Sequence, residues 1–291
     1  MAESIAKVLI ACFLFWGFTA AAQEHWPSPE VEQMFQNAQE NAARGNYKDA
    51  ITTYKHAMTL APGQVVLYRE MGRAQYMAQS FKEAEATLLS AKEMKGADAV
   101  VYQLLALSEE AQGHSKEAMK TLDKGLLLFP SSGSLYYDKG RLYYNDSKDK
   151  EALQCWIDGI KADPGYAANY GGAAGIYLET DKVMWGLIYG ETYLAIRQDT
   201  TEDEHMKERL YAGYKKLFDN LPETKKDKPA NFEEAYTDIY LSLTPVVSDG
   251  ISTENLTMAR TRFLMEWTNK YGKQYPLKLF AYHDSLIPNG L

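Results

Sequence analysis

The sequence is poor in the residues that build disulfide frameworks and metal centres. It has two cysteines, Cys12 and Cys155, among 291 residues, and this number excludes a disulfide-stapled fold. The five histidines are scattered, and no two of them have the i, i+4 spacing of a zinc-binding metalloprotease helix. Asp249-Gly250 lacks the further oxygen ligands of a calcium loop. We therefore expect no metal site and no cofactor.

Positive charge is also in short supply. The chain has 31 lysines and arginines against 39 aspartates and glutamates, which gives a formal net charge of -8. This excess of acid argues against a general affinity for nucleic acid or for an anionic lipid surface.

Catalytic motifs are missing from the sequence as well. There is no Gly-x-Ser-x-Gly elbow and no phosphate-binding glycine loop followed by Lys-Ser/Thr. The glycine-rich stretch from Gly171 to Gly175 is expected to lie inside a helix, where small residues favour close packing rather than nucleotide binding. We predict that the chain is not an enzyme.

A long apolar run occurs at the amino terminus. Residues 1–7 precede an apolar run from Val8 to Phe18, and small residues follow as far as Ala22. This order predicts a signal peptide over residues 1–22 with cleavage after Ala22, a periplasmic or secreted protein, and no stable membrane span after cleavage. Two alternatives are a lipoprotein cleavage box ending at Cys12 and an uncleaved anchor, although about 15 apolar residues fall short of the roughly 20 that span a bilayer.

Export and cleavage would leave a single cysteine in the mature chain. Cys155 stands beside Trp156 on a predicted helix. A lone cysteine in such a position is expected to be a buried structural thiol rather than a reactive one.

A period of 34 residues runs through the middle of the chain. Small residues recur at that interval, and so do bulky ones four residues later: Ala50, Ala84, Ala118 and Ala152, followed by Tyr54, Leu88, Leu122 and Trp156. A period of this length is typical of stacked helical hairpins. A generic helical bundle with accidental periodicity is the alternative, and the agreement of four copies speaks against it.

The repeating unit resembles the tetratricopeptide repeat. The residues that carry the resemblance in the first copy are Gly45, Tyr47, Ala50, Tyr54, Ala57 and Pro62. The resemblance covers residues 31–198 and implies about five repeats. The fifth is degenerate, because Gly186 replaces the alanine, Gly190 replaces the bulky residue, and Gln198 stands where the closing proline is expected.

The fold that this resemblance implies is all-α: a solenoid of helical hairpins wound as a right-handed superhelix, with a small helical unit at the carboxyl end. Residues 199–221 are predicted to form a closing helix that begins with a Thr201/Glu204 capping box and has an apolar stripe at Met206, Leu210, Tyr214 and Leu217. The charged, proline-bounded stretch 222–230 is predicted to be a linker. Residues 231–291 are predicted to form a helical unit that rests on the array or on another chain. Its first helix is expected to be capped by Asn231, its second to run from about Thr253 to Tyr271, and its third to begin at Pro276.

Candidate binding residues follow from the repeat geometry that the resemblance implies. The first helix of each hairpin lines the concave surface of such arrays, which places two sets of residues on one groove: Arg69, Arg73 and Tyr76, and Tyr137, Arg141 and Tyr144. Guanidinium groups bind carboxylates in bidentate fashion, and tyrosines offer stacking area. The alternative is that Arg69 and Arg141 pair with neighbours such as Glu70 and Asp138, and that the tyrosines are simply packed.

These residues favour an exported scaffold or adaptor that binds a partner in its groove. The expected partner is a protein or an extended peptide with acidic residues or a free carboxyl terminus. A glycan- or peptide-binding module and an accessory subunit of an envelope enzyme are the alternatives. The lysine and asparagine set of the chaperone-binding carboxylate clamp is not reproduced, since Phe35, Gln39, Gln103 and Leu107 occupy the corresponding positions.

Overall fold

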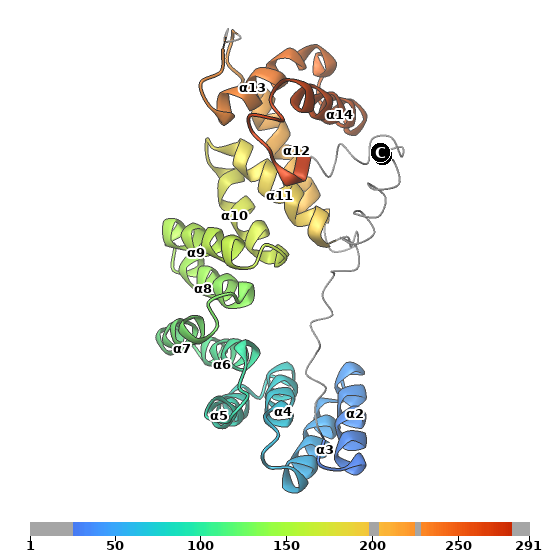
Figure 1. Cartoon of the computed structure of the whole chain (residues 1–291), viewed down its shortest axis with the longest axis vertical. Helices are drawn as coiled ribbons and strands as arrows, with labels where there is room; N and C mark the ends of the chain where they lie inside the picture. Colours follow the sequence, from blue (N-terminus) through green and yellow to red (C-terminus); the bar gives the residue numbers. More distant parts are fainter. Residues whose placement is uncertain (1–25, 198–203, 225–227, 281–291) are drawn as a thin grey trace, which may run out of the picture. The chain divides into compact units, whose positions relative to one another are not determined.

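The computed structural model of the chain describes residues 26–197, 204–224 and 228–280. The predicted signal peptide and the predicted cap at Thr201 lie outside these ranges. Throughout the described ranges the regular structure is helical, in consecutive hairpins, which confirms the predicted fold class (Figure 1). The chain divides into two compact units, Met1–Gln112 and Gly113–Leu291, and each is described by itself.

The helices match the hairpins that the period predicts. The first unit contains α2 (Pro29–Ala43), α3 (Tyr47–Leu60), α4 (Val65–Met77), α5 (Phe81–Lys92) and α6 (Ala99–Ala111). The second contains α7 (Ser115–Leu128), α8 (Gly133–Asn145), α9 (Asp149–Ala162), α10 (Ala167–Glu179), α11 (Val183–Arg197), α12 (Glu204–Asp219), α13 (Phe232–Ser242), a 3-10 turn (Thr244–Val247) and α14 (Thr253–Lys270).

One residue with a left-handed backbone ends the first helix of each of the first four repeats. These residues also follow the 34-residue interval: Gly45 with φ 81°, Gln79 with φ 59°, Gly113 with φ 82° and Ser147 with φ 58°. The left-handed residue turns the chain so that the next amide bonds back to the helix end, as Lys148 N does to Tyr143 O at 2.9 Å. The repeat is therefore encoded in the backbone as well as in the packing.

The recurring small residues allow the helices of a hairpin to approach closely. Ala50, Ala84 and Ala152 have no exposed surface. A Cβ added to Gly72 of α4 would lie 2.6 Å from Cγ of Leu88 on α5, so this glycine leaves room for the bulky residue of its own repeat. Each repeat thus fills its core with one large side chain between small ones.

The fifth repeat reverses this pattern and depends on α12 for its core. Gly190 stands at the bulky position, and a Cβ there would lie 2.7 Å from Leu210 and 3.2 Å from the sulfur of Met206, both on α12. The closing helix therefore supplies the side chains that α11 lacks. Met206, Leu210, Tyr214 and Leu217, which form the predicted apolar stripe of this helix, are all buried.

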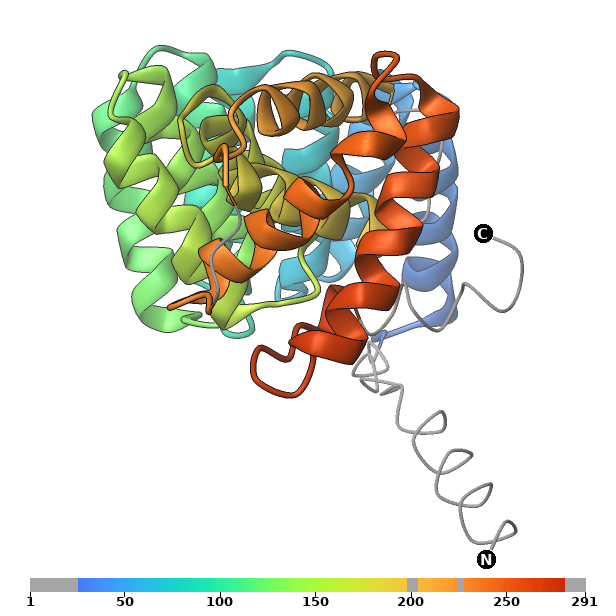
Figure 2. The ribbon, with the colours of Figure 1, turned by 90° about the horizontal axis from the view of Figure 1, so that it is seen from above.

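The carboxyl-terminal helices share a core with the end of the array. Buried residues of α10, α11 and α12 form one hydrophobic cluster with Tyr236, Ile239, Phe263, Trp267 and others from α13 and α14. The sequence predicted that this unit rests on the array or on another chain, and in the structure it packs on the array. Figures 1 and 2 both draw α13 and α14, coloured orange to red, side by side at this end of the second unit.

The predicted helix boundaries in this region agree closely with the structure. Asn231 caps α13, since its Oδ1 accepts a hydrogen bond of 2.9 Å from Glu234 N. The second helix, expected over Thr253 to Tyr271, runs over Thr253–Lys270. Helical conformation begins again at Lys278, two residues after Pro276, and the rest of the predicted third helix lies outside the described residues.

Candidate functional site: a pocket over α10

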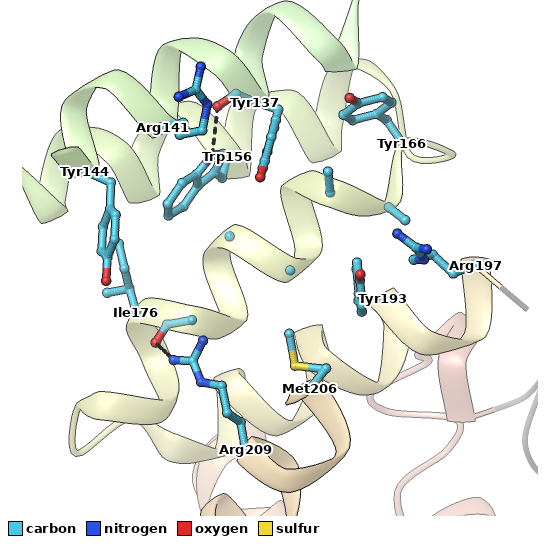
Figure 3. A pocket seen from close by; sticks show the side chains of 15 residues that line it. Tyr137, Arg141, Tyr144, Trp156, Tyr166, Ile176, Tyr193, Arg197, Met206 and Arg209 are labelled. Atoms are coloured by element: carbon cyan, nitrogen blue, oxygen red, sulfur yellow. Dashed lines mark hydrogen bonds between the residues drawn. The ribbon is translucent and has the colours of Figure 1, made fainter. Parts of the chain in front are cut away.

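A pocket of about 570 Å³ opens over α10 in the second unit. Figure 3 shows α10 as its floor, with α8 on one side and α11 and α12 on the other. The lining combines aromatic side chains, arginines and small residues: Tyr137, Arg141, Tyr144, Trp156, Tyr166, Ala167, Ala168, Gly171, Gly172, Gly175, Ile176, Tyr193, Arg197, Met206 and Arg209. Three of the six predicted groove residues, Tyr137, Arg141 and Tyr144, are among them.

The pocket exists because the fifth repeat has no side chains where the fourth has large ones. Gly171 and Gly175 stand one repeat of 34 residues after Tyr137 and Arg141. The positions that carry a ring and a guanidinium on α8 therefore carry only hydrogen on α10. Because α10 lacks these two side chains, its surface between the two walls is recessed.

The wall on α8 is built around Trp156 of α9. The indole Nε1 of Trp156 donates a hydrogen bond of 3.2 Å to the carbonyl oxygen of Tyr137, and the two rings stack with centroids 6.5 Å apart. Tyr144 lies 5.9 Å from the same indole and keeps 52% of its surface exposed. Burial raises the pKa of Tyr137, so its hydroxyl is protonated at neutral pH.

Arg141, on the same wall, pairs with a buried carboxylate. Its Nε lies 3.5 Å from Oδ1 of Asp138, one helical turn earlier on α8. Asp138 is buried, so the pair does more than bridge two surface groups. The ion pair of the alternative interpretation is thus present, and Arg141 lines the pocket at the same time.

The opposite wall repeats the combination of tyrosine and arginine. On α11, Arg197 lies over the ring of Tyr193, with its guanidinium carbon 5.6 Å from the ring centroid. The pair has the same i, i+4 spacing as Tyr137 and Arg141 on α8. A Cβ on Gly171 would lie 3.1 Å from the Tyr193 ring, so the ring rests directly on the floor.

Arg209 of α12 is fixed against the backbone of the floor helix. Its Nη2 donates to the carbonyl oxygen of Gly175 at 2.8 Å and to Oε1 of Glu179 at 3.1 Å. A Cβ on Gly175 would lie 3.3 Å from Nη1, so the glycine makes room for the guanidinium group. Nε and Nη1 of Arg209 have no hydrogen-bond partner among the described residues.

The lining is therefore rich in hydrogen-bond donors. Among the residues that the structure describes, it contains three arginines and no aspartate, glutamate, asparagine or glutamine. Arginine donates and never accepts, whereas a tyrosine hydroxyl does both. The described part of the lining thus combines arginine donors with aromatic walls.

The other three predicted groove residues lie on α4 in the first unit. Arg69 pairs through Nε with Glu70 at 2.8 Å and through Nη1 with Asp98, and Arg73 shares the same glutamate at 3.0 Å. The ring of Tyr76 packs 5.4 Å from that of Phe81. This set forms an ion-paired and packed cluster of the kind that the alternative interpretation expects.

Neither metal chemistry nor thiol chemistry is supported within the described ranges. No group of three or more histidine, cysteine or acidic side chains is placed there to hold a metal ion. Burial raises the pKa of Cys155 to about 11, so the thiol is protonated at neutral pH, as a structural cysteine should be. In the same ranges no helix has the length and apolar character needed to cross a bilayer.

The sequence prediction missed most of the wall opposite α8. Tyr193, Arg197 and Arg209 were not among the predicted groove residues, because Tyr193 and Arg197 lie on the second helix of the fifth repeat and Arg209 lies beyond the array. A signal for the pocket was nevertheless present. Advancing Tyr137 and Arg141 by one repeat reaches Gly171 and Gly175, and two glycines at groove positions indicate a hollow.

The fold and the site together define a helical-repeat protein with a pocket near the end of its array. Residues 41–107 match the family model of the tetratricopeptide repeat. These residues are similar to tetratricopeptide repeats, and proteins that contain such repeats are typically interaction scaffolds without catalytic activity.

Solved structures resemble the chain in fold at low sequence identity. The tetratricopeptide-repeat protein TTC0263 of Thermus thermophilus is 14% identical, with a TM-score of 0.50 over 63% of this chain and 98% of its own. A chain in the structure of the APC/C hetero-tetramer Cut9-Hcn1 is 17% identical, with a TM-score of 0.50 over 63% of this chain and 36% of the matched chain. A comparison with curated proteins finds no match.

Proposed function

We propose that the protein is an exported scaffold that holds a segment of a protein partner in the pocket over α10. The observation that supports this most directly is the pocket itself, a hollow with aromatic walls and arginines on both sides, built on the fold of an interaction family. Its volume lies within the range of about 300–1,000 Å³ in which proteins bind small groups, so it suits a few residues of a partner.

The proposal that the chain is not itself an enzyme has the same basis. Within the described ranges, the pocket lining holds no carboxylate, histidine or thiol that could act as a general base or a nucleophile. The tyrosines and arginines there bind and orient a partner. A glycan is less well suited, because sugar hydroxyls need acceptors as well as donors and the lining offers few acceptors.

A capture experiment tests the pocket. The mature protein, residues 23–291, is compared with the double variant Tyr144→Ala/Arg197→Ala, in which both altered side chains are exposed. Each protein is cross-linked in its native envelope, and the cross-linked partners are identified by mass spectrometry. We expect the pocket variant to lose the main cross-linked partner. Arg262→Ala/Met265→Ala, which alters two exposed side chains of α14, is the control and should keep it. Equal yields of the cross-linked partner from both variants would show that the pocket does not bind it.

Export is tested separately by cell fractionation. The full chain should appear outside the cytoplasm with an amino terminus at Gln23, and a chain that lacks residues 1–22 should stay in the cytoplasm. Amino-terminal sequencing distinguishes this outcome from an intact anchor and from processing at Cys12. A full-length chain recovered from the cytoplasm would contradict the export part of the proposal.

A further inference from the structure

We propose that the pocket over α10 takes one aromatic side chain from the partner, at the place where the fifth repeat has no ring of its own. This inference rests on the proposed function and names the type of side chain that the pocket selects. Three observations support it: the glycine that replaces a ring on α10, the aromatic groups that line the hollow, and the close packing that fixes one of its walls.

The fourth repeat shows what the fifth repeat lacks. The ring of Tyr137 on α8 lies 6.5 Å from the indole of Trp156 and 6.2 Å from the ring of Tyr166. One repeat of 34 residues after Tyr137 and Trp156, the chain has Gly171 on α10 and Gly190 on α11. Side chains of α12 fill the space over Gly190, whereas Gly171 lines the pocket. The hollow therefore lies where a regular fifth repeat would place a ring.

Aromatic groups line this hollow from both helices that flank α10. Tyr137 and Tyr144 lie on the α8 side, and Tyr193 lies on the α11 side (Figure 3). A ring that enters between such groups makes offset or edge-to-face contacts, which contribute more than the burial of apolar area alone. Met206 of α12 also lines the hollow, and a thioether makes favourable contacts with a ring. An aromatic side chain therefore gains more here than an aliphatic one of equal size.

The wall on α8 is held in place by close packing before anything binds. Tyr137 and Tyr144 pack against the indole of Trp156. That indole fits between two helices at glycines, because a Cβ on Gly140 would overlap its Nε1 and a Cβ on Gly172 would lie 2.5 Å from its Cδ2. A wall that is already ordered loses little side-chain entropy when a ring binds to it. Recognition through rings and a thioether also requires no charge on the partner.

The preference is tested with three uncharged probes, the N-acetyl amides of phenylalanine, cyclohexylalanine and alanine, titrated by ligand-observed NMR. The chain of residues 23–291 should bind the phenylalanine amide about threefold or more tightly than the cyclohexylalanine amide, which is similar in size but has no π system. The alanine amide should bind about tenfold or more weakly, because it fills little of the hollow. Equal binding of the phenylalanine and cyclohexylalanine amides would overturn the inference.

A variant that fills the hollow connects the preference to the pocket. Gly171→Tyr supplies a ring from α10 itself and should abolish binding of the phenylalanine amide. A Cβ at this position lies 3.1 Å from the ring of Tyr193, so a small shift of that ring accommodates it. Gly63→Tyr adds the same side chain in the first unit, where no atom lies within 4 Å of the new Cβ, and should leave binding unchanged. Binding that persists in a folded Gly171→Tyr protein would contradict the inference.

A second measurement locates the probe without any substitution. The N-acetyl amide of p-benzoylphenylalanine, a photoreactive aromatic probe, is cross-linked to the unaltered chain, and mass spectrometry identifies the attachment sites. Attachment to the pocket lining that excess phenylalanine amide suppresses would support the inference. Attachment only at other residues would refute it, whether or not Gly171→Tyr folds.

The capture experiment separates this inference from the proposed function. If capture of the partner depends on the pocket but the phenylalanine amide is not preferred, the inference fails and the proposed function stands. If capture does not depend on the pocket, the proposed function fails even where the phenylalanine amide binds.

Discussion

At the scale of single residues, the repeat imposes a backbone conformation that two side chains adopt at a cost. Gly45 and Gly113 take a left-handed conformation freely, whereas Gln79 and Ser147 take it with φ of 59° and 58°. A side chain in this region costs about 1–2 kcal/mol relative to an ordinary conformation. The chain therefore carries strain at two of four equivalent turns.

Ser147→Gly should stabilise the protein. Glycine adopts the required φ without strain, and its greater freedom in the unfolded chain offsets part of the gain, so we expect the free energy of unfolding to rise by about 0.5–1 kcal/mol. Urea titration followed by circular dichroism measures it. Ser147→Ala removes the hydroxyl and keeps the strain, so it should show no such gain. A glycine variant no more stable than the alanine variant would refute the explanation.

At the scale of helices, a buried polar network ties α11, α12 and α14 together. Glu191 of α11 accepts a hydrogen bond from the hydroxyl of Tyr214 on α12 and pairs with Arg260 of α14 at 2.8 Å. The Glu191 side chain is 9% exposed and that of Arg260 is 39% exposed. Burial raises the pKa of Tyr214 and the charge of Glu191 raises it further, so the hydroxyl stays protonated and donates.

Removing one partner of this network should cost more than removing both charges. Arg260→Met leaves a buried carboxylate without its counter-charge, and we expect a loss of about 2–3 kcal/mol in the free energy of unfolding, at the low end for buried pairs because Arg260 is partly exposed. Adding Glu191→Gln to this variant should recover part of the loss. A double-mutant cycle from urea denaturation measures the coupling. Additive effects would mean that the two charges do not stabilise each other.

Helices proved easier to predict from the sequence than the site. The 34-residue period located the hairpins, because close helix packing requires small residues such as Ala50 and Ala152 at fixed positions. The cap at Asn231 marks the start of α13 by a local hydrogen bond, which adjacent residues determine. The pocket depends instead on tertiary placement: nothing adjacent to Arg209 in sequence indicates that it reaches the carbonyl of Gly175.

At the scale of the whole molecule, the array cannot be separated cleanly from the segment that follows it. The rings of Tyr214 and Phe218 on α12 lie 6.0 Å and 5.6 Å from that of Tyr240 on α13. The fully buried Trp267 belongs to the same cluster as Leu187 of α11. The predicted 222–230 linker therefore joins two stretches of chain that bury a common core.

A chain of residues 23–221 should consequently be less stable than a chain of residues 23–291. Removing residues 222–291 uncovers the faces of α11 and α12 that pack on α13 and α14, and each large side chain returned to water costs about 1.5–3 kcal/mol. We expect a lower thermal midpoint, and binding of the dye ANS to the newly exposed apolar surface, relative to residues 23–291. Thermal circular dichroism and dye fluorescence measure both quantities. An unchanged midpoint without dye binding would show that the end of the array is stable alone. The fifth repeat would then not need the core that it shares with α13 and α14.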